Sequence, residues 1–510
     1  MIDQDTSPKL HEPFFIGKVE IKNRILRSSL SGRIDNFDGS GTPWRKDFEK
    51  TFARGGVGAI ISSHVPIHYS GRVLPNYAFI DDDDKIPFWR ELKDELSDHA
   101  KRHSPDKKDC PYFMQLSYSG RQRDLGGIEN LDRVPFEYRD ARPLSPTDQR
   151  DSFHGLKGKR MTVEDIDWMV EQFAAAARRA ARAGIDGLEL HSSNGYLFTQ
   201  FISSAINNRT DEYGGSLENR FRFWRRVIDA IKSDPETREL PLIAKLSVVE
   251  RNNAIRPFQP KGNTVEESID VARMCEKAGA DAIHVSAGTL FPHPWNPAGY
   301  LPEDFVPRTY KTLIDSGAPL FWWGWLPQTW AIYLVFRYRP SRWAARMVWE
   351  RTLRRRLYPS FMDYLRGNKP SPSSADAGWK KLEGLSVDAA AGVKSAVGIP
   401  VICTGAFQTM EGIQEALNGK CDFVSIARPL LANPNLPAQL VAQSAGLAAN
   451  PSWHEAPCTL CNRCLLAAPE FPLGCLDESR LAEKFPNDRE ARFQAMIQRI
   501  FALYKLPVDL

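Results

Sequence analysis

Eight short apolar segments recur along this 510-residue chain, and segments with helical periodicity separate them. Each apolar segment is rich in Val, Ile and Leu and apolar on both faces, as a strand of a parallel sheet covered by helices must be. Because eight strands alternate with helices, the sequence predicts an α/β fold, a (β/α)8 TIM barrel, with an open doubly wound sheet as the competitor. The predicted strands are Val19–Ser29, Val57–Ser63, Pro111–Ser117, Ile185–His191, Pro241–Ser247, Asp281–Ala287, Ile399–Gly405 and Cys421–Ala427.

Two of the intervening segments show where their helices begin. Apolar residues recur at spacings of three and four from Ile166 to Ala177, after Thr162, and from Leu217 to Ile231, after Ser216. Thr and Ser hydroxyls accept hydrogen bonds from the free N–H groups at a helix start, so both residues are N-cap candidates. No glycine-rich fingerprint follows the first predicted strand, which argues against the open dinucleotide-binding sheet.

The amino-acid composition limits the kinds of function that this chain can have. An apolar share of 42% and a charged share of 25% are those of a folded globular protein. A net charge of +4 is small for this length and gives no general argument for a nucleic-acid partner. The N-terminal stretch MIDQDTSPKLHEPF lacks the charged-then-apolar layout of a secretory signal. Eight cysteines are too few for a disulfide scaffold in so long a chain, so we expect a cytoplasmic protein.

Polar residues gather at the carboxyl ends of the predicted strands, where a (β/α)8 barrel places its site. In the short loops after the last two strands, Gly405 lets the backbone approach a ligand and Arg428 can pair with an anion. These loops favour phosphate binding, with ordinary tight turns as the alternative. The strand-end residues are Ser29, Leu30, Ser31, Ser63, His64, Gln115, His191, Asn194, Tyr196, Lys245, Ser286, Thr404, Gly405, Ala406, Ala427 and Arg428.

The strand spacing breaks between the sixth and seventh strands, where roughly 110 residues intervene although one helix and two loops need far fewer. We assign residues 291–385 to an insertion. Within it, Ala318–Phe336 is almost wholly apolar and holds four tryptophans, and eight arginines follow up to residue 356. Its length approaches a membrane span, but Pro319, Gly324 and Pro327 interrupt the helix. Three interpretations stay open: contact with a membrane surface through residues 318–356, an aromatic lid, or a dimer contact.

Four cysteines near the C-terminus follow the pattern C-x2-C-x2-C-x10-C. Three thiolates from one tight loop and a fourth further along suit a cubic iron–sulfur cluster. Zinc is the second interpretation, although zinc sites usually pair C-x2-C units more symmetrically. Reduced cysteines without a metal are the third. The residues concerned are Cys458, Cys461, Cys464 and Cys475.

These motifs together resemble the old yellow enzyme family of NADH:flavin oxidoreductases. Residues 191–223, HSSNGYLFTQFISSAINNRTDEYGGSLENRFRF, match the family's hallmark nearly residue for residue. KNRILRSSLS, GGVGAIISS, QLSYSGRQ, TGAF and SIARPLLANPNLP match in the family's order, so the resemblance covers about residues 10–440 outside the insertion. The cysteine loop is similar to that of the longer branch with 2,4-dienoyl-CoA reductase and trimethylamine dehydrogenase, which holds a 4Fe–4S cluster.

The resemblance implies noncovalently bound FMN at the strand ends, with NAD(P)H as the reductant. Gln115 and Lys245 would face the pyrimidine edge of the flavin, and Arg428 would help to hold its phosphate. Lys245 stands where family members often carry arginine, and His64 fills a place that is usually small. The implied cofactor-binding residues are Ser29, Leu30, Ser31, Ser63, His64, Gln115, Lys245, Gly405, Ala406, Ala427 and Arg428.

The implied reaction is reduction of the C=C bond of a hydrophobic α,β-unsaturated carbonyl compound. His191 and Asn194 would donate hydrogen bonds to the substrate carbonyl. Tyr196, neutral at pH 7, would protonate the α-carbon. Alternatives are a flavin/iron–sulfur oxidative dehydrogenase, a dienoyl-CoA-type reductase that passes electrons through the cluster, and a non-enzymatic membrane scaffold.

The electron source depends on the C-terminal part of the chain. Relatives that carry the cluster continue into a dinucleotide-binding region, for which the residues after Cys475 leave no room. Either NAD(P)H reduces FMN directly, or a separate electron-transfer partner acts through a cluster at Cys458, Cys461, Cys464 and Cys475. We expect a barrel over residues 1–440 and a Cys-rich extension over residues 441–510, with a homo-oligomer left open.

Overall fold

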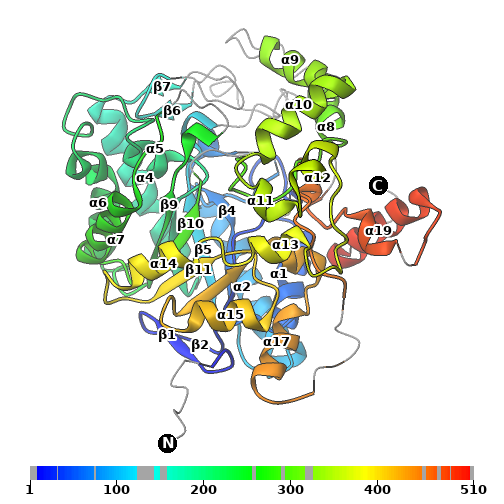
Figure 1. Ribbon diagram of the computed structural model, residues 1–510. Coiled ribbons are helices and arrows are strands. Elements are labelled where there is room, and N and C mark those ends of the chain that lie inside the picture. The colour runs from blue at the N-terminus through cyan, green and yellow to red at the C-terminus, as the bar shows by residue number, and fades with distance from the viewer. Residues whose placement is uncertain are drawn as a thin grey trace, which may run out of the picture.

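Eight parallel strands close into a barrel at the centre of the computed structural model (Figure 1). The structure describes residues 9–31, 33–73, 76–122, 143–149, 158–254, 260–288, 293–315, 326–448, 450, 455–467, 472–482 and 484–505. Each barrel strand overlaps one of the eight predicted segments, so the predicted (β/α)8 barrel is confirmed. In the order of the barrel, the strands are β3 (Ile25–Arg27), β4 (Ala59–Pro66), β5 (Tyr112–Ser117), β8 (Gly187–Ser192), β9 (Leu242–Val249), β10 (Ala282–Ala287), β11 (Val401–Thr404) and β12 (Phe423–Ile426).

Closure comes from the pairing of the last strand with the first, in which Val424 lies opposite Ile25. A short antiparallel hairpin, β1 (Phe14–Ile16) and β2 (Val19–Ile21), packs its apolar side chains under the amino-terminal end of the strands. Two further two-residue strands, β6 (Leu144–Ser145) and β7 (Lys159–Arg160), pair outside the barrel. Because the hairpin covers the amino-terminal end of the barrel, ligand-binding side chains are expected at the opposite, carboxyl end of the strands.

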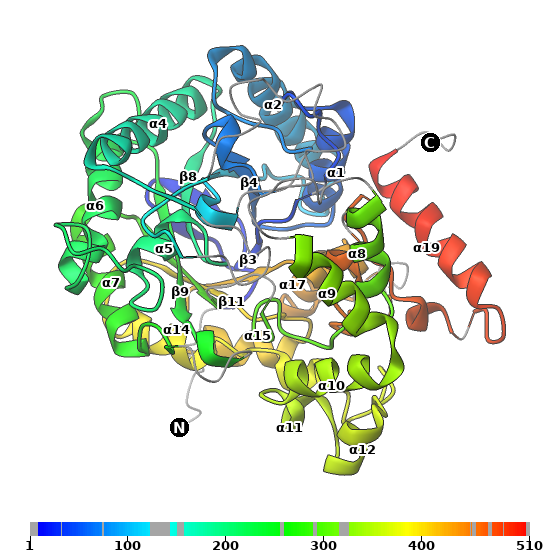
Figure 2. The ribbon, with the colours of Figure 1, turned by 90° about the horizontal axis from the view of Figure 1, so that it is seen from above.

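Helices surround the barrel, as the view along its axis shows (Figure 2). Thr162 accepts a hydrogen bond from the Asp165 N–H in a capping box, and Ser216 caps the next predicted helix, so both predicted helix starts are confirmed. The surrounding helices are α1 (Pro43–Arg54), α2 (Ile86–His103), α4 (Val163–Arg182), α6 (Leu217–Ser233), α7 (Val265–Ala278), α14 (Val387–Lys394), α15 (Met410–Leu417) and α17 (Leu436–Ser444); α5 (Leu197–Ile202) and α16 (Arg428–Ala432) are short helices after β8 and β12.

The insertion between β10 and β11 forms a helical layer of its own. Its helices are α8 (Val306–Asp315), α9 (Leu326–Arg337), α10 (Arg339–Glu350), α11 (Arg354–Leu357), α12 (Phe361–Arg366) and α13 (Gly378–Leu382). Of the four tryptophans in the apolar stretch, Trp330 lies on α9. The other three, Trp322, Trp323 and Trp325, lie outside the described residues. Among the helices that the structure describes, none is long and apolar enough to cross a membrane.

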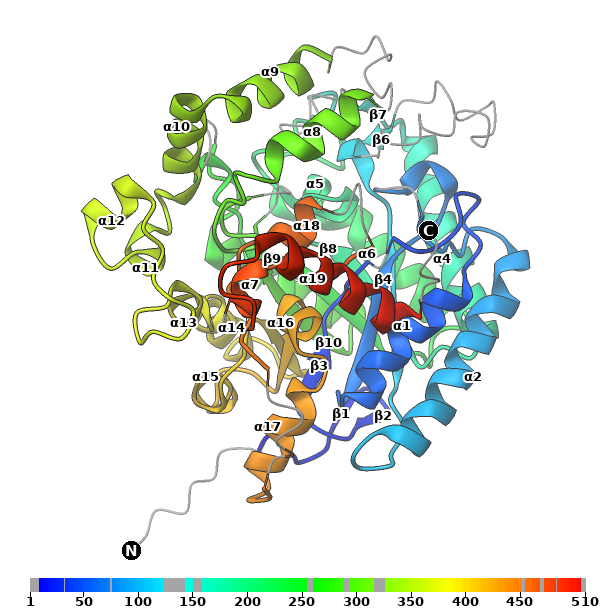
Figure 3. The same ribbon diagram turned by 90° about the vertical axis from the view of Figure 1, so that its right-hand side faces the viewer.

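The C-terminal segment, with α18 (Arg463–Leu466) and α19 (Arg489–Tyr504), packs against the barrel helices (Figure 3). The ring of Tyr504 lies 4.9 Å from that of Phe48 on α1, centroid to centroid. Thr51 on α1 donates a hydrogen bond of 3.2 Å from Oγ1 to the carbonyl oxygen of Leu503. This segment therefore shares the hydrophobic core of the barrel, and the division at residue 440 stays a prediction.

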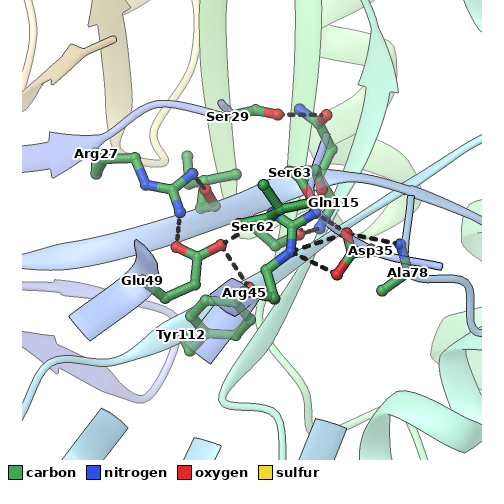
Figure 4. A network of polar contacts seen from close by, with 12 residues as sticks. Arg27, Ser29, Asp35, Arg45, Glu49, Ser62, Ser63, Ala78, Tyr112 and Gln115 are labelled. Carbon is green, nitrogen blue, oxygen red and sulfur yellow. Dashed lines mark hydrogen bonds and ion pairs between the residues drawn. The ribbon is translucent and has the colours of Figure 1, made fainter. Parts of the chain in front are cut away.

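A fully buried network of charges joins β3 to α1 (Figure 4). Glu49 forms ion pairs with Arg27 and, at 3.6 Å, with Arg45. Arg45 also pairs with Asp35, its Nε lying 3.1 Å from Oδ2. Tyr112 donates a hydrogen bond of 3.2 Å to Glu49 Oε1. Since burying a charge is costly unless it is paired, these groups stabilise the fold only as a complete set.

The same network connects two loops at the carboxyl end of the barrel. Asp35 lies in the loop after β3 and accepts a hydrogen bond of 3.0 Å from the N–H of Ala78, in the loop after β4. Asn76 donates a further bond of 3.0 Å to the carbonyl oxygen of Asp35. The loop after β3 carries Ser29, and the loop after β4 carries Tyr77. Both residues line the cavity described below, so the network helps to position its walls.

Replacing Glu49 by alanine should lower the free energy of unfolding by about 3–5 kcal/mol, because Arg27 and Arg45 stay buried without their shared anion. Urea denaturation of both proteins measures the difference. Glu91→Ala is the matched control, since the Glu91 side chain is 63% exposed in its ion pair with Lys46. Its removal should cost about 0–1 kcal/mol. Equal losses for the two variants would contradict a structural role of the buried network.

Candidate functional site

A cavity of about 250 Å³ opens at the carboxyl ends of the barrel strands. It brings together residues from many separate parts of the chain, including the insertion and the cysteine loop. Ser63 is fully buried in β4 but is not among the residues that line the cavity. The other predicted catalytic and cofactor-binding residues line it, namely Ser29, Leu30, Ser31, His64, Gln115, His191, Asn194, Tyr196, Lys245, Gly405, Ala406, Ala427 and Arg428.

A buried carboxylate, Glu189 on β8, organises the floor beneath this cavity. Gln115 donates a hydrogen bond of 2.6 Å from Nε2 to Glu189 Oε1, and Nδ1 of His284 lies 2.5 Å from Oε2. The ammonium of Lys245 lies 3.8 Å from the same carboxylate. Ser29 in turn donates a bond of 2.9 Å to Gln115 Oε1. Side chains from β5, β8, β9 and β10 are thereby held in one arrangement.

The charges in this floor follow from burial and from one another. Burial alone would raise the pKa of Glu189, but Lys245 and His284 hold it below its ordinary value. Burial and the Lys245 cation lower the pKa of His284, despite the opposing effect of Glu189. A neutral His284 donates from Nδ1 to the carboxylate, and its Nε2 lies 2.8 Å from the Thr404 hydroxyl and 2.7 Å from the Ser425 hydroxyl, one of which can donate to it. The floor is therefore a Lys–Glu ion pair supported by a neutral histidine.

One wall of the cavity is a cluster of rings. The ring centroids of His191 and Tyr196 lie 4.9 Å apart, and those of His64 and Tyr196 lie 5.2 Å apart. Tyr77 lies 5.4 Å from His64. Burial raises the pKa of Tyr196 above its ordinary value and, together with the Lys245 cation, lowers that of His191 well below its ordinary value. Burial lowers the pKa of His64 to about 3. The wall therefore presents a protonated phenol and neutral imidazoles at neutral pH.

Asn194 occupies a left-handed backbone conformation, with φ at 60°, directly after β8. Gln122 supports this turn by donating a hydrogen bond of 2.9 Å to the backbone carbonyl of Asn194. Asn296, from the start of the insertion, donates its side-chain amide to Asn194 Oδ1. With its oxygen engaged, Asn194 has its Nδ2 hydrogens left to donate to a ligand or to its neighbour Tyr196.

The loops after β11 and β12 form the other end of the cavity. Ala406 has a φ of 55°, and a Cβ on Gly405 would lie 2.9 Å from the ring of Phe407, so a larger residue would disturb this turn. Arg428, the first residue of α16, donates to Asn462 Oδ1. A guanidinium beside a closely approaching backbone suits a phosphate group, so the residues present here fit the phosphate of FMN.

The four predicted cysteine ligands line one small second cavity. Arg428 lines both cavities, so the cysteine loop adjoins the main site. Arg480 places its Nη1 3.3 Å from the Sγ of Cys475. Burial raises the pKa of Cys458 to about 11. Four thiols in one cavity, with two arginines to offset thiolate charge, are a donor set that fits an iron–sulfur cluster. In the described part of the chain, no three His, Cys, Asp or Glu residues are arranged to hold a single metal ion.

Asn462 joins three parts of the chain at this point. It accepts from Arg428 and donates from Nδ2 to the carbonyl oxygens of Pro297 and Tyr300, at 3.1 Å each. Its φ of 61° is a left-handed conformation that asparagine adopts more readily than most residues. The cysteine loop, the insertion and the loop after β12 are therefore connected through one side chain.

Several site residues escaped the sequence-based prediction. Glu189 and His284 lie within strands, and the signal available for them was a charged or polar residue inside an otherwise apolar run. Tyr77 and Asn296 lie in loops, where no periodicity singles them out. The insertion, the cysteine loop and the residue before α14 also supply cavity residues that had no signal, namely Trp295, Pro297, Ala298, Leu382, Leu385, Leu465, Leu473 and Ser386.

A closed parallel barrel with a polar cavity at its strand ends defines the class of (β/α)8 barrel enzymes. Within that class, the chain belongs to the NADH:flavin oxidoreductase / NADH oxidase family, whose sequence pattern matches residues 9–313. This confirms the resemblance to the old yellow enzyme family.

Individual relatives cover different shares of the chain. NADH oxidase of Thermoanaerobacter brockii is 28% identical over 432 residues, which are 84% of this chain and 50% of that protein. NADPH dehydrogenase of Geobacillus sp. (strain WCH70) is 32% identical over 285 residues, or 56% of this chain and 74% of that protein. The chain thus spans about half the length of the first relative. The structure of 2-naphthoyl-CoA reductase with 2-naphthoyl-CoA shares the fold, with a TM-score of 0.63 and 20% identity over 94% of this chain and 58% of that one.

Glu189→Gln should destabilise the protein by about 3–5 kcal/mol near pH 7, because buried Lys245 loses its anion. The pKa of Glu189 lies below its ordinary value, so its contribution is complete above about pH 4.3 and is lost as the pH falls through its native pKa. The stability difference between wild type and variant should therefore shrink in acid, as urea denaturation across the pH range measures.

The surface variant Glu239→Gln is the control for this charge removal, since the Glu239 side chain is 74% exposed. It should change stability by no more than about 0.5 kcal/mol. A Glu189→Gln difference that stays constant down to strong acid would contradict the ion pair with Lys245.

Proposed function

We propose that this protein is an NAD(P)H-dependent FMN oxidoreductase that reduces the C=C bond of a hydrophobic α,β-unsaturated carbonyl compound. One observation carries the proposal: His191, Asn194 and Tyr196 share one cavity with Gln115 and Lys245. Two hydrogen-bond donors and a protonated phenol beside a cofactor site are what reduction of a conjugated alkene requires. Membership in an NADH:flavin oxidoreductase family supports the cofactor and the reductant.

The proposed cofactor position follows from the charges in the cavity. Gln115, Lys245 and Ser29 would hold the flavin ring, with the positive charge of Lys245 beside it. Gly405, Ala406, Ala427 and Arg428 would hold the phosphate. When bound and reduced, FMN supplies a hydride.

His191 and Asn194 would bind and orient the substrate carbonyl. Ser193 Oγ lies 3.3 Å from His191 Nδ1, and where that hydroxyl donates to Nδ1, the imidazole proton is on Nε2 and can be donated. A neutral imidazole and an amide donate hydrogen bonds without carrying a full charge into the cavity. Donors already in place stabilise negative charge that develops on the carbonyl oxygen, because they need no reorganisation.

Tyr196 would hold the proton that the α-carbon receives. Burial keeps the pKa of this phenol above its ordinary value, so the proton is present at neutral pH. Leu382, Leu385, Leu465 and Leu473 add apolar surface to the cavity, which favours a hydrophobic substrate and excludes water.

Tyr196→Phe should lower the rate of alkene reduction by about 10²–10⁴-fold, because the positioned proton is lost. Reduction of the bound flavin by NAD(P)H should stay close to wild type. Stopped-flow absorbance of the flavin separates the two half-reactions, with cyclohexenone as the alkene probe.

The control is Tyr118→Phe, which removes a buried hydroxyl 2.9 Å from Ser70 Oγ and outside the cavity lining. It should leave both half-reactions unchanged. Purified protein without a flavin spectrum, or a Tyr196→Phe variant with wild-type alkene reduction, would refute the proposed function.

A second candidate function rests on the shared position of Arg428. An iron–sulfur cluster held by Cys458, Cys461, Cys464 and Cys475 would adjoin the flavin site through this residue. A cluster supplies a one-electron route, which fits an oxidative dehydrogenase or a dienoyl-CoA-type reductase with a separate electron-transfer partner. The insertion and the cysteine loop both reach the main cavity, so either function would use the same walls.

Metal analysis of anaerobically purified protein tests this second candidate. Iron and acid-labile sulfide at cluster stoichiometry are expected, and Cys461→Ser should lose both. Cys275→Ser, a fully buried thiol on α7, should keep them. Zinc in place of iron would favour the zinc alternative. The absence of both metals would refute the cluster and leave the cysteines with a structural role.

A further inference from the structure

The helix α9 of the insertion is apolar on both of its faces. Its inward face, with Ile332, Tyr333 and Phe336, packs against the small core around Leu301 and Tyr310. A helix that is apolar all round is normally buried on all sides. This one is covered on its inward face only, as its outward residues show.

Exposed apolar residues on α9 are followed along the chain by others on α10, and we call the two sets together the α9–α10 face. Eight of the twelve exposed large hydrophobic residues in the described part of the chain lie in the insertion. The other four, Phe15, Val163, Trp168 and Leu447, are scattered over the barrel. The α9–α10 face consists of Trp330 (43% exposed), Leu334 (44%), Val335 (39%), Tyr338 (58%), Trp343 (47%) and Val348 (43%).

The charges that α9 and α10 themselves expose have one sign. Residues 326–349 include four arginines and no acidic residue. Arg337 and Arg339 are exposed beside Tyr338. The first acid that follows, Glu350, is fully buried and pairs with Arg346 at 3.4 Å, so it does not offset the exposed cations.

The helices α9 and α10 lie at the end of the molecule where the site opens. In two perpendicular views, α9 and α10 stand at the end of the molecule opposite the β1–β2 hairpin, the end at which the cavity opens (Figures 1 and 3). Both ends of the insertion line that cavity, through Trp295 and Asn296 on one side and Leu382 and Leu385 on the other. One segment therefore builds the cavity wall and presents the exposed apolar face.

We propose that the α9–α10 face binds the surface of an anionic lipid bilayer. Tryptophan, tyrosine and leucine side chains partition into the boundary between headgroups and acyl chains, and arginines bind the headgroup phosphates. The described helices of the insertion are too short to cross the bilayer, so the contact is one along the surface. A second copy of the chain is the poorer occupant, because two arginine-rich faces without acids would repel each other.

Sedimentation of the flavin-loaded protein with vesicles tests the proposal. Wild type should bind vesicles of equimolar phosphatidylglycerol and phosphatidylcholine, and at least about tenfold more weakly vesicles of phosphatidylcholine alone, because the arginines lose their anionic partners. Binding to the anionic vesicles should weaken as salt is added. No binding to either vesicle would overturn the proposal.

Point variants locate the contact. Leu334→Asp places a charge in the apolar face and should weaken vesicle binding about tenfold or more. The double variant Arg337→Glu/Arg339→Glu should weaken binding by a similar factor and reduce its salt dependence. Leu447→Asp is the matched control, because Leu447 is 66% exposed after α17, and it should bind vesicles as wild type does.

The remaining outcomes separate this inference from the proposed function. Flavin content and cyclohexenone turnover without vesicles should be unchanged in Leu334→Asp, so loss of lipid binding and loss of catalysis are distinguishable. Vesicle binding that is the same in wild type and Leu334→Asp would overturn the proposal. A wild-type dimer that Leu334→Asp dissociates, without vesicle binding by either, would assign the face to a second copy.

Discussion

The ion pair between Glu189 and Lys245 is the interaction on which the site depends. A carboxylate buried on a barrel strand is tolerated only where cations and donors surround it, and here they come from β5, β9 and β10. These partners hold Gln115 and Lys245 in one arrangement at the bottom of the cavity. The side chains that would face the cofactor are thus fixed before any ligand binds, which is how a rigid barrel prepares a site.

Around this floor, the cavity walls come from segments far apart in the chain. The buried network of Arg27, Glu49, Arg45 and Asp35 connects the loops after β3 and β4. Asn462 connects the cysteine loop, the insertion and the loop after β12. The barrel supplies the proposed chemistry, while the insertion and the C-terminal segment close the cavity and give it apolar surface.

Much of this could be predicted from the sequence, for particular physical reasons. The eight strands could be found because strands covered on both faces are continuously apolar, and the starts of α4 and α6 because Thr162 and Ser216 satisfy free N–H groups. His191, Asn194 and Tyr196 could be found because His191 lies at the end of one strand and the other two follow it closely. The course of the insertion could not be predicted, because its apolar length fits a membrane segment, a lid or an interface equally well.

The sequence by itself determined the local features: apolar strands, helix caps, polar strand ends and the cysteine spacing. These depend on neighbours a few residues away, and their periodicity is visible in the chain. Only the tertiary structure decided that Glu189 meets His284, that Arg428 lines both cavities, and that α9 leaves one apolar face uncovered. Such contacts join residues that are distant in the chain and arise from barrel closure, so no local pattern in the sequence records them.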